Sequence, residues 1–343
     1  MRQFRFLAVL ACILALAGCK NNSKRTLLPN VSGKAGEVLV VIEREQWEGN
    51  LGVAIRGVLA SDTPYLAQRE PLYALSNVPP GSFTNMFKMH RNLLLVNIDP
   101  QNATNGVVYK NNVWAQPQAL VQINAADQAE ARSLFEEAAP VIAEYFEQSE
   151  RDRIIANAKL YEERALQAPV KQVTGGILHF PSGYRCRKLT DDFTWIADEK
   201  QYTNQTVLVY SYEATGVPEI EFAPESIIET RNRIMQANVP GTVDGSYMTT
   251  STAQEPTFRS LRYHGRDFVE TRGFWEVHGE FMGGPFVSHS FYSPDGKKMI
   301  VLEAFVFAPR YDKRQYLRQV ESLLYSFEWA DKTENTNQND KNK

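Results

Sequence analysis

The chain has 343 residues, more than one hydrophobic core usually organises, so two compact units or one large elaborated sheet are expected. With 43% hydrophobic and 22% charged residues, the sequence is neither disordered nor fibrous in composition. The net charge of -3 argues against a polyanion binder, because nucleic-acid affinity comes largely from Lys and Arg. We therefore expect no nucleic-acid partner.

The N-terminus has the pattern of a secretory signal. Two arginines precede an apolar run over residues 6–16 that is too short to span a bilayer as a permanent helix. The run ends in Leu16-Ala17-Gly18-Cys19, which resembles the lipobox of bacterial lipoproteins. The resemblance implies that residues 1–18 are a lipoprotein signal peptide and that Cys19 is the lipid attachment site. An ordinary secretory signal with a chance Cys is the alternative.

A lipid anchor would make the membrane the first partner of this protein and place it in the cell envelope. In Bacteroidota lipoproteins, acidic residues directly after the lipidated Cys resemble a surface-export signal. Lys20-Asn21-Asn22 contains no acidic residue, so we expect this protein on the periplasmic face of the outer membrane. Residues 19–36 are polar and contain Pro29, Gly33 and Gly36, a composition typical of a flexible tether.

Residues 37–167 are predicted to form an N-terminal α/β sub-domain. Three segments have the continuous apolar runs of strands buried on both faces: residues 38–42, 93–98 and 119–123. Helical spacing of apolar residues predicts a helix over residues 47–60.

A long helix is predicted to end this sub-domain. Asp127 and Glu130 form a capping-box pattern, and apolar residues repeat at helical spacing beyond them. We expect a kink or restart at Pro140 and an end near Leu166.

Residues 168–329 are predicted to form a C-terminal α/β sub-domain with long hairpins and a terminal helix. Strands are predicted at residues 177–180, 207–212, 268–281, 286–292 and 298–307, and helices at 224–235 and from a cap at Asp312 to about 327. Gly283-Gly284 and Pro294-Asp295-Gly296 are the predicted hairpin turns. Residues 330–343 are expected to be a disordered tail.

These elements predict an α/β (α+β) fold with two sub-domains of mixed or antiparallel sheet flanked by helices. The lipobox, Gly36-Glu37-Val38-Leu39-Val40-Val41, Arg91-Asn92-Leu93-Leu94-Leu95-Val96 and the C-terminal hairpins with their helix are together similar to a family of Bacteroidota lipoproteins known only as a domain of unknown function. Because these motifs are structural, the resemblance implies no catalytic residue. In element order the second half also resembles the PsbP-like α/β/α sandwich.

One pattern on the predicted hairpin suggests a metal site. If Gly283-Gly284 is a two-residue loop, His278 lies opposite His289 with Cβ atoms about 5 Å apart. Glu276 and Glu280 then share their face, because strand side chains alternate. Two imidazoles and one or two carboxylates could hold Zn or a similar divalent ion, which would be the cofactor. A polar face with buried, hydrogen-bonded histidines is the alternative.

A second cluster is basic, since Arg259, Arg262, Arg266 and Arg272 are interleaved with aromatic residues. Guanidinium groups beside aromatic rings bind carboxylates, phosphates or sugar acids. An exposed strand whose arginines pair with Asp267 and Glu270 is the alternative.

The sequence contains no HExxH, GxSxG, CxxC, EF-hand or P-loop motif, so no catalytic residue is predicted. We therefore favour a non-enzymatic binding or assembly module with an envelope protein or glycan as partner. An envelope hydrolase or metal-dependent enzyme that uses the His278 and His289 hairpin is the alternative.

Overall fold

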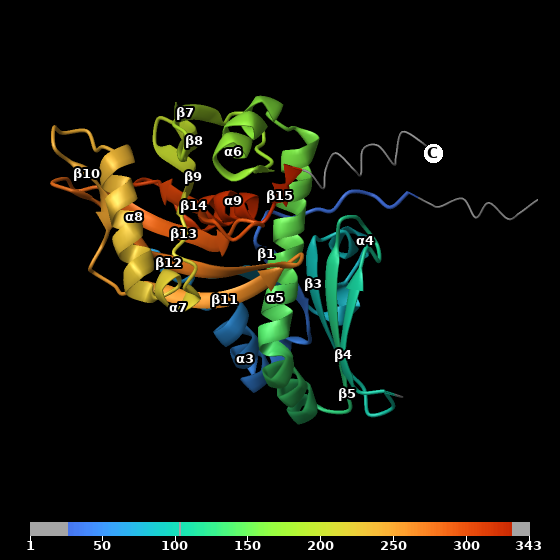
Figure 1. Ribbon diagram of the computed structural model, residues 1–343. Helices are drawn as coiled ribbons and strands as arrows, with labels where there is room; N and C mark the ends of the chain where they lie inside the picture. Colours follow the sequence, from blue (N-terminus) through green and yellow to red (C-terminus); the bar gives the residue numbers. More distant parts are fainter. Residues whose placement is uncertain (1–26, 103, 331–343) are drawn as a thin grey trace, which may run out of the picture.

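The computed structural model describes residues 27–102 and 104–330. The predicted signal peptide, the predicted lipid attachment site Cys19 and most of the predicted C-terminal tail lie outside these residues. The α+β fold class is confirmed, since two sheets, one from each half of the chain, are flanked by helices (Figure 1).

The first sheet is mixed and has the order β2-β1-β3-β5-β4. Its strands are β1 (Glu37–Val41), β2 (Ala74–Val78), β3 (Asn92–Ile98), β4 (Gly106–Asn111) and β5 (Ala119–Ala125). Four strands run parallel, and β4 adds an antiparallel edge. The connections carry α2 (Arg44–Glu48), α3 (Asn50–Leu59), the 3-10 turn η1 (Pro80–Ser82) and α4 (Asn85–Lys88).

Both faces of this sheet are buried, which explains the unbroken apolar runs of its central strands. Helices α3 and α5 cover one face, where Leu51 and Ile55 pack with Phe135 and Phe146. Smaller apolar groups, among them Phe83 and Trp114, cover the other.

Helix α5 (Gln128–Leu160) connects the halves and runs between the two sheets (Figure 1). The predicted capping box is confirmed at its start, where the Asp127 carboxylate accepts a hydrogen bond from the Glu130 backbone N–H at 2.8 Å. The helix continues through Pro140 and ends at Leu160, before the predicted end near Leu166.

Part of the segment predicted to be a tether lies on the folded body. The Ser32 N–H donates to the Met89 carbonyl oxygen at 2.8 Å, and the Gln116 N–H donates to the Pro29 carbonyl oxygen at 2.8 Å. Backbone pairing with the first sub-domain therefore begins near residue 29 instead of residue 37.

The second sheet has eight strands and is antiparallel, in the order β10-β12-β13-β14-β9-β8-β7 with β11 paired to β12. Its strands are β7 (Arg185–Leu189), β8 (Phe193–Lys200), β9 (Thr203–Glu213), β10 (Tyr247–Thr250), β11 (Thr257–Tyr263), β12 (Arg266–His278), β13 (Gly283–Tyr292) and β14 (Lys298–Phe307). A separate two-stranded pair joins β6 (Gly176–Ile177) to β15 (Glu328–Trp329).

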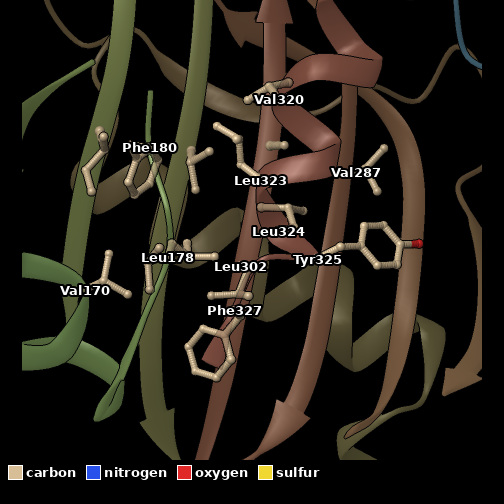
Figure 2. Close-up of a cluster of buried hydrophobic side chains, with 14 of the residues drawn as sticks. Val170, Leu178, Phe180, Val287, Leu302, Val320, Leu323, Leu324, Tyr325 and Phe327 are labelled. Carbon is tan, nitrogen blue, oxygen red and sulfur yellow. The ribbon is translucent and has the colours of Figure 1, made fainter. Parts of the chain in front are cut away.

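Helices cover both faces of this sheet. They are the 3-10 turn η2 (Arg164–Leu166), α6 (Gln167–Thr174), α7 (Pro218–Glu221), α8 (Pro224–Asn238) and α9 (Arg314–Leu324). Figure 2 shows Val320, Leu323 and Leu324 of α9 in the core beside Leu302 of the sheet. Helix α8 packs on the opposite face through Met235, in a core that includes Trp275.

The two halves also contact each other through polar side chains. Arg318 on α9 pairs with Glu147 on α5 at 2.9 Å. The buried Glu70 carboxylate accepts hydrogen bonds from the Lys313 and Arg314 backbone N–H groups, each at 2.7 Å. The predicted cap at Asp312 is therefore wrong, because the α9 N-terminus is satisfied by an acid of the first half of the chain.

Among the helices of the described ranges, none is both long enough and apolar enough to span a membrane.

Candidate functional site

The β12–β13 hairpin has a different register from the predicted one. Gly283 pairs with Glu276 inside the ladder, and the Val277 N–H donates to the Met282 carbonyl oxygen at 2.9 Å to close the turn. His289 pairs with Glu270 instead of His278. The predicted histidine pair is therefore wrong.

Gly283 and Gly284 do not form a turn. They lie inside the sheet, where the backbone of a neighbouring strand comes close to them. A Cβ atom on Gly284 would collide with the Val306 carbonyl oxygen and would meet the Trp275 indole at 3.1 Å. Glycine inside a strand is typical of such backbone contacts, and here the sequence pattern was mistaken for a two-residue loop.

The four predicted metal ligands lie apart as a consequence. His278 stacks on Tyr247 at the end of β12, with 5.1 Å between ring centroids, and His289 is 0% exposed. Glu280 accepts hydrogen bonds from the Ser246 hydroxyl (2.5 Å) and the Thr242 N–H (2.6 Å), and hydrogen bonds from these two residues lower its pKa to about 2. Glu276 pairs with Thr249 on β10. Within the described ranges, no three His, Cys, Asp or Glu side chains are grouped for metal binding.

Two of the four predicted anion-binding arginines share an internal carboxylate. Arg259 and Arg272 both pair with the buried Glu270 at 2.8 Å. Arg272 also binds Glu321 of α9 at 2.5 Å. Burial alone would raise the pKa of Glu270, but the Arg272 guanidinium holds it well below its usual range. Arg272 therefore fastens α9 to the sheet, while Arg259 pairs within it.

Arg262 and Arg266 lie in different settings at the other end of the segment. Arg262 is exposed and lies 3.6 Å from Asp267, so it already has an anionic partner. For Arg266, in contrast, the described part of the chain places no carboxylate within ion-pair distance. Arg266 is thus the member of the predicted cluster with charge left to offer a ligand.

The β11–β12 turn determines where Arg266 lies. His264 (φ 48°) and Gly265 (φ 80°) both have positive φ, as a two-residue turn of the I′ type requires. This turn pairs Tyr263 with Arg266 across the hairpin, and strand alternation puts Arg266 on the same face as the buried Phe268.

The Arg266 guanidinium is surrounded by aromatic rings. Its central carbon lies 4.7 Å from the ring centroid of Phe291 and 5.0 Å from that of Phe327, within the range of cation–π attraction. Two N–H groups donate long hydrogen bonds of 3.4 Å to the Leu324 and Phe327 carbonyl oxygens. The Nε atom is buried and finds no hydrogen-bond partner among residues 27–102 and 104–330. Burial lowers the pKa of Arg266 to about 10, which leaves it charged at neutral pH.

A groove of about 1080 Å³ opens beside Arg266. The β12–β13 register stops at Val269 and Ser290, although β12 begins at Arg266 and β13 ends at Tyr292. We call this space the hairpin groove, and its aromatic lining comes from Phe222, Tyr263, Phe268, Tyr292, Phe327 and Trp329. A side pocket of about 480 Å³ shares Tyr263, His264, Phe327 and Glu328 with it and extends to α5.

The other charged groups of the hairpin groove are already paired. Arg262 lies beside Asp267, and Glu328 binds Lys159 at 2.5 Å. The nearby His179 and Lys159 lower the pKa of Glu328 to about 2, so this carboxylate is negative at neutral pH. The lining therefore combines apolar rings, paired charges and the Arg266 guanidinium, which has no carboxylate partner within the described part of the chain.

Sequence reasoning found Arg266 but missed the wall formed by β15. Phe327 was assigned to the face of the last helix, and Trp329 was given no role. Alternation of Phe327 and Trp329 just after a helix was the available signal, because residues two apart share one face of a strand.

Two family models match the chain, each described as a domain of unknown function. Residues 31–159 match "Domain of unknown function (DUF8532)", and residues 163–326 match "Domain of unknown function (DUF4837)". The two matches meet close to the boundary between residues 167 and 168 that we expect from the sequence. No curated protein matches the chain.

Solved structures offer distant likenesses. The Ran-binding protein Mog1p of Saccharomyces cerevisiae is 10% identical, with 46% of this chain and 92% of that chain covered and a TM-score of 0.30. LpqN of Mycobacterium tuberculosis, described as involved in cell envelope biogenesis, is 12% identical, with 43% and 78% covered and a TM-score of 0.28. At these TM-scores we draw neither fold family nor function from them.

Proposed function

We propose that this protein is a lipid-anchored, non-enzymatic binding module of the cell envelope, and that the hairpin groove holds its ligand. The observation that carries the binding role is Arg266, a charged and largely enclosed guanidinium in an aromatic groove with no carboxylate partner among the described residues. Buried polar groups are normally satisfied, so a group left unpaired beside a groove favours a ligand there.

The proposed anchor is an acyl group on Cys19, on the periplasmic face of the outer membrane. The support is the sequence Leu16-Ala17-Gly18-Cys19 after a short apolar run. Metabolic labelling with an alkyne analogue of palmitate tests it: the parent chain becomes labelled and a Cys19→Ala chain does not. Equal labelling of both chains would refute the anchor.

Ligand binding is tested by native mass spectrometry of the full chain, purified gently from its own envelope. We expect a stoichiometric non-protein adduct beyond the mass of the lipidated chain. Arg266→Gln should lose the adduct, while Arg187→Gln should keep it, because Arg187 is exposed, paired with Glu199 and outside the groove lining. An adduct retained by Arg266→Gln, or a parent protein without any adduct, would refute a ligand in the hairpin groove.

A further inference from the structure

The lining of the hairpin groove restricts the chemistry of the ligand body. Apart from paired charges, the groove is lined mainly by aromatic rings and by apolar residues such as Leu261, Val269 and Pro294. A ligand that fills such a space gains most from burying its own apolar surface. The volume of about 1080 Å³ is large enough for a molecule of drug or fatty-acyl size.

The charges of the groove restrict the ligand head group. Among the described residues, Arg266 supplies a positive charge without a carboxylate partner, while Asp267 and Glu328 are paired with Arg262 and Lys159. A head group with two negative charges would therefore bring a second charge that no unpaired cation of the described groove lining neutralises. A carboxylate has a single charge and a planar pair of oxygens that matches the fork of a guanidinium.

We infer that the hairpin groove binds a monocarboxylic acid with an apolar body, its carboxylate on Arg266 and its body along Tyr263, Phe327 and Trp329. This inference rests on the proposed binding function and specifies its ligand class. Arg266 is suited to this role because it lines the groove and its two N–H groups make only long bonds of 3.4 Å to carbonyl oxygens.

The test compares three probes on the full-length lipoprotein in lipid nanodiscs. Octanoate carries one charge, octanamide has the same shape without charge, and octyl phosphate carries up to two charges. Calorimetric titration, with empty nanodiscs as the blank for membrane partition, gives each affinity. We expect octanoate to bind about tenfold to a hundredfold more tightly than octanamide, the range of a charge-assisted hydrogen bond. Octyl phosphate should bind more weakly than octanoate at pH 8.

Variants then assign the preference to one side chain. Arg266→Gln should bind octanoate and octanamide equally, and Arg187→Gln, an exposed arginine paired with Glu199 and outside the groove lining, should keep the parent preference. Circular dichroism checks that each variant is folded, and should Arg266→Gln fail to fold, the three probes on the parent chain decide by themselves.

Each contrary result has a distinct meaning. Equal binding of octanoate and octanamide by the parent, or tighter binding of octyl phosphate, would refute the monocarboxylate and leave the binding function standing. Failure of all three probes while a native adduct persists would also refute the monocarboxylate and leave the binding function standing. Absence of both probe binding and adduct would refute the proposed function itself.

Discussion

Arg231 on α8 and Glu303 on β14 form an ion pair that is almost completely enclosed. Their side chains are 1% and 0% exposed and lie 2.7 Å apart, and the guanidinium also covers the Phe286 ring at 3.9 Å. Removing one partner would leave an uncompensated charge in the core. Glu303→Gln should therefore lower the free energy of unfolding by about 3–5 kcal/mol, measured by denaturant titration.

The exposed pair of Arg187 with Glu199 provides the matched control. Its side chains are 53% and 35% exposed, so Glu199→Gln should cost less than about 1 kcal/mol. A similar loss in both variants would contradict the role assigned to burial.

His289 is a buried residue whose charge state should couple stability to pH. Burial lowers its pKa well below the ordinary value, and the groups that face it are Glu270, Arg266, Arg272 and Arg151, with Tyr325 in ring contact at 4.6 Å. Glu270 opposes the shift, whereas the arginines reinforce it. The folded protein therefore holds His289 neutral at pH values where the unfolded chain takes up a proton.

Stability should fall as pH drops below about 6.5, because protons then bind preferentially to the unfolded state. For His289 alone the loss between pH 7.5 and 5.5 is about 1 kcal/mol. Denaturant titrations at the two pH values should show that His289→Phe removes this part of the loss. An unchanged pH dependence in the variant would show that His289 is not its source.

At the scale of elements, α9 depends on an acid from the other half of the chain. Glu70 accepts two backbone N–H groups at the helix N-terminus, whereas the nearer Asp312 is exposed. Glu70→Ala should lower the free energy of unfolding by about 1–2 kcal/mol. Asp312→Ala is the control and should change it by no more than about 0.5 kcal/mol. The reverse order in denaturant titrations would restore Asp312 as the cap.

Elements with strong local patterns could be predicted, and their long-range partners could not. Apolar runs identified β1, β3 and β14, and a capping box identified the start of α5. The α9 cap was missed because Glu70 lies far away in sequence. The hairpin register was missed because Gly284 avoids a clash with Val306 on a neighbouring strand, a contact that local sequence does not report.

In the candidate site, too, the local pattern could be predicted and the long-range partners could not. Aromatic residues interleaved with arginines pointed to the segment that contains Arg266. Which arginines were free to bind a ligand depended on Glu270 and Asp267, and on Glu321 of a distant helix. The ion pairs of the other three arginines, which the local sequence does not reveal, therefore distinguish Arg266 from them.

At the scale of the whole molecule, the two halves share packing as well as polar contacts. Ile154, Ile155 and Ala158 of α5 join the core of the second half, and Arg318 pairs with Glu147. We expect one cooperative unfolding transition, with equal calorimetric and van't Hoff enthalpies in differential scanning calorimetry. Two separate transitions would show that the halves unfold as independent units.

Hydrogen exchange of the full-length protein, with and without saturating octanoate, tests the central claim most directly. Exchange should slow in peptides covering residues 260–269 and 327–329, which line the hairpin groove, and the slowing should be absent in Arg266→Gln. Slowing that lies elsewhere, or that persists in Arg266→Gln, would contradict the assignment of the hairpin groove as the ligand site.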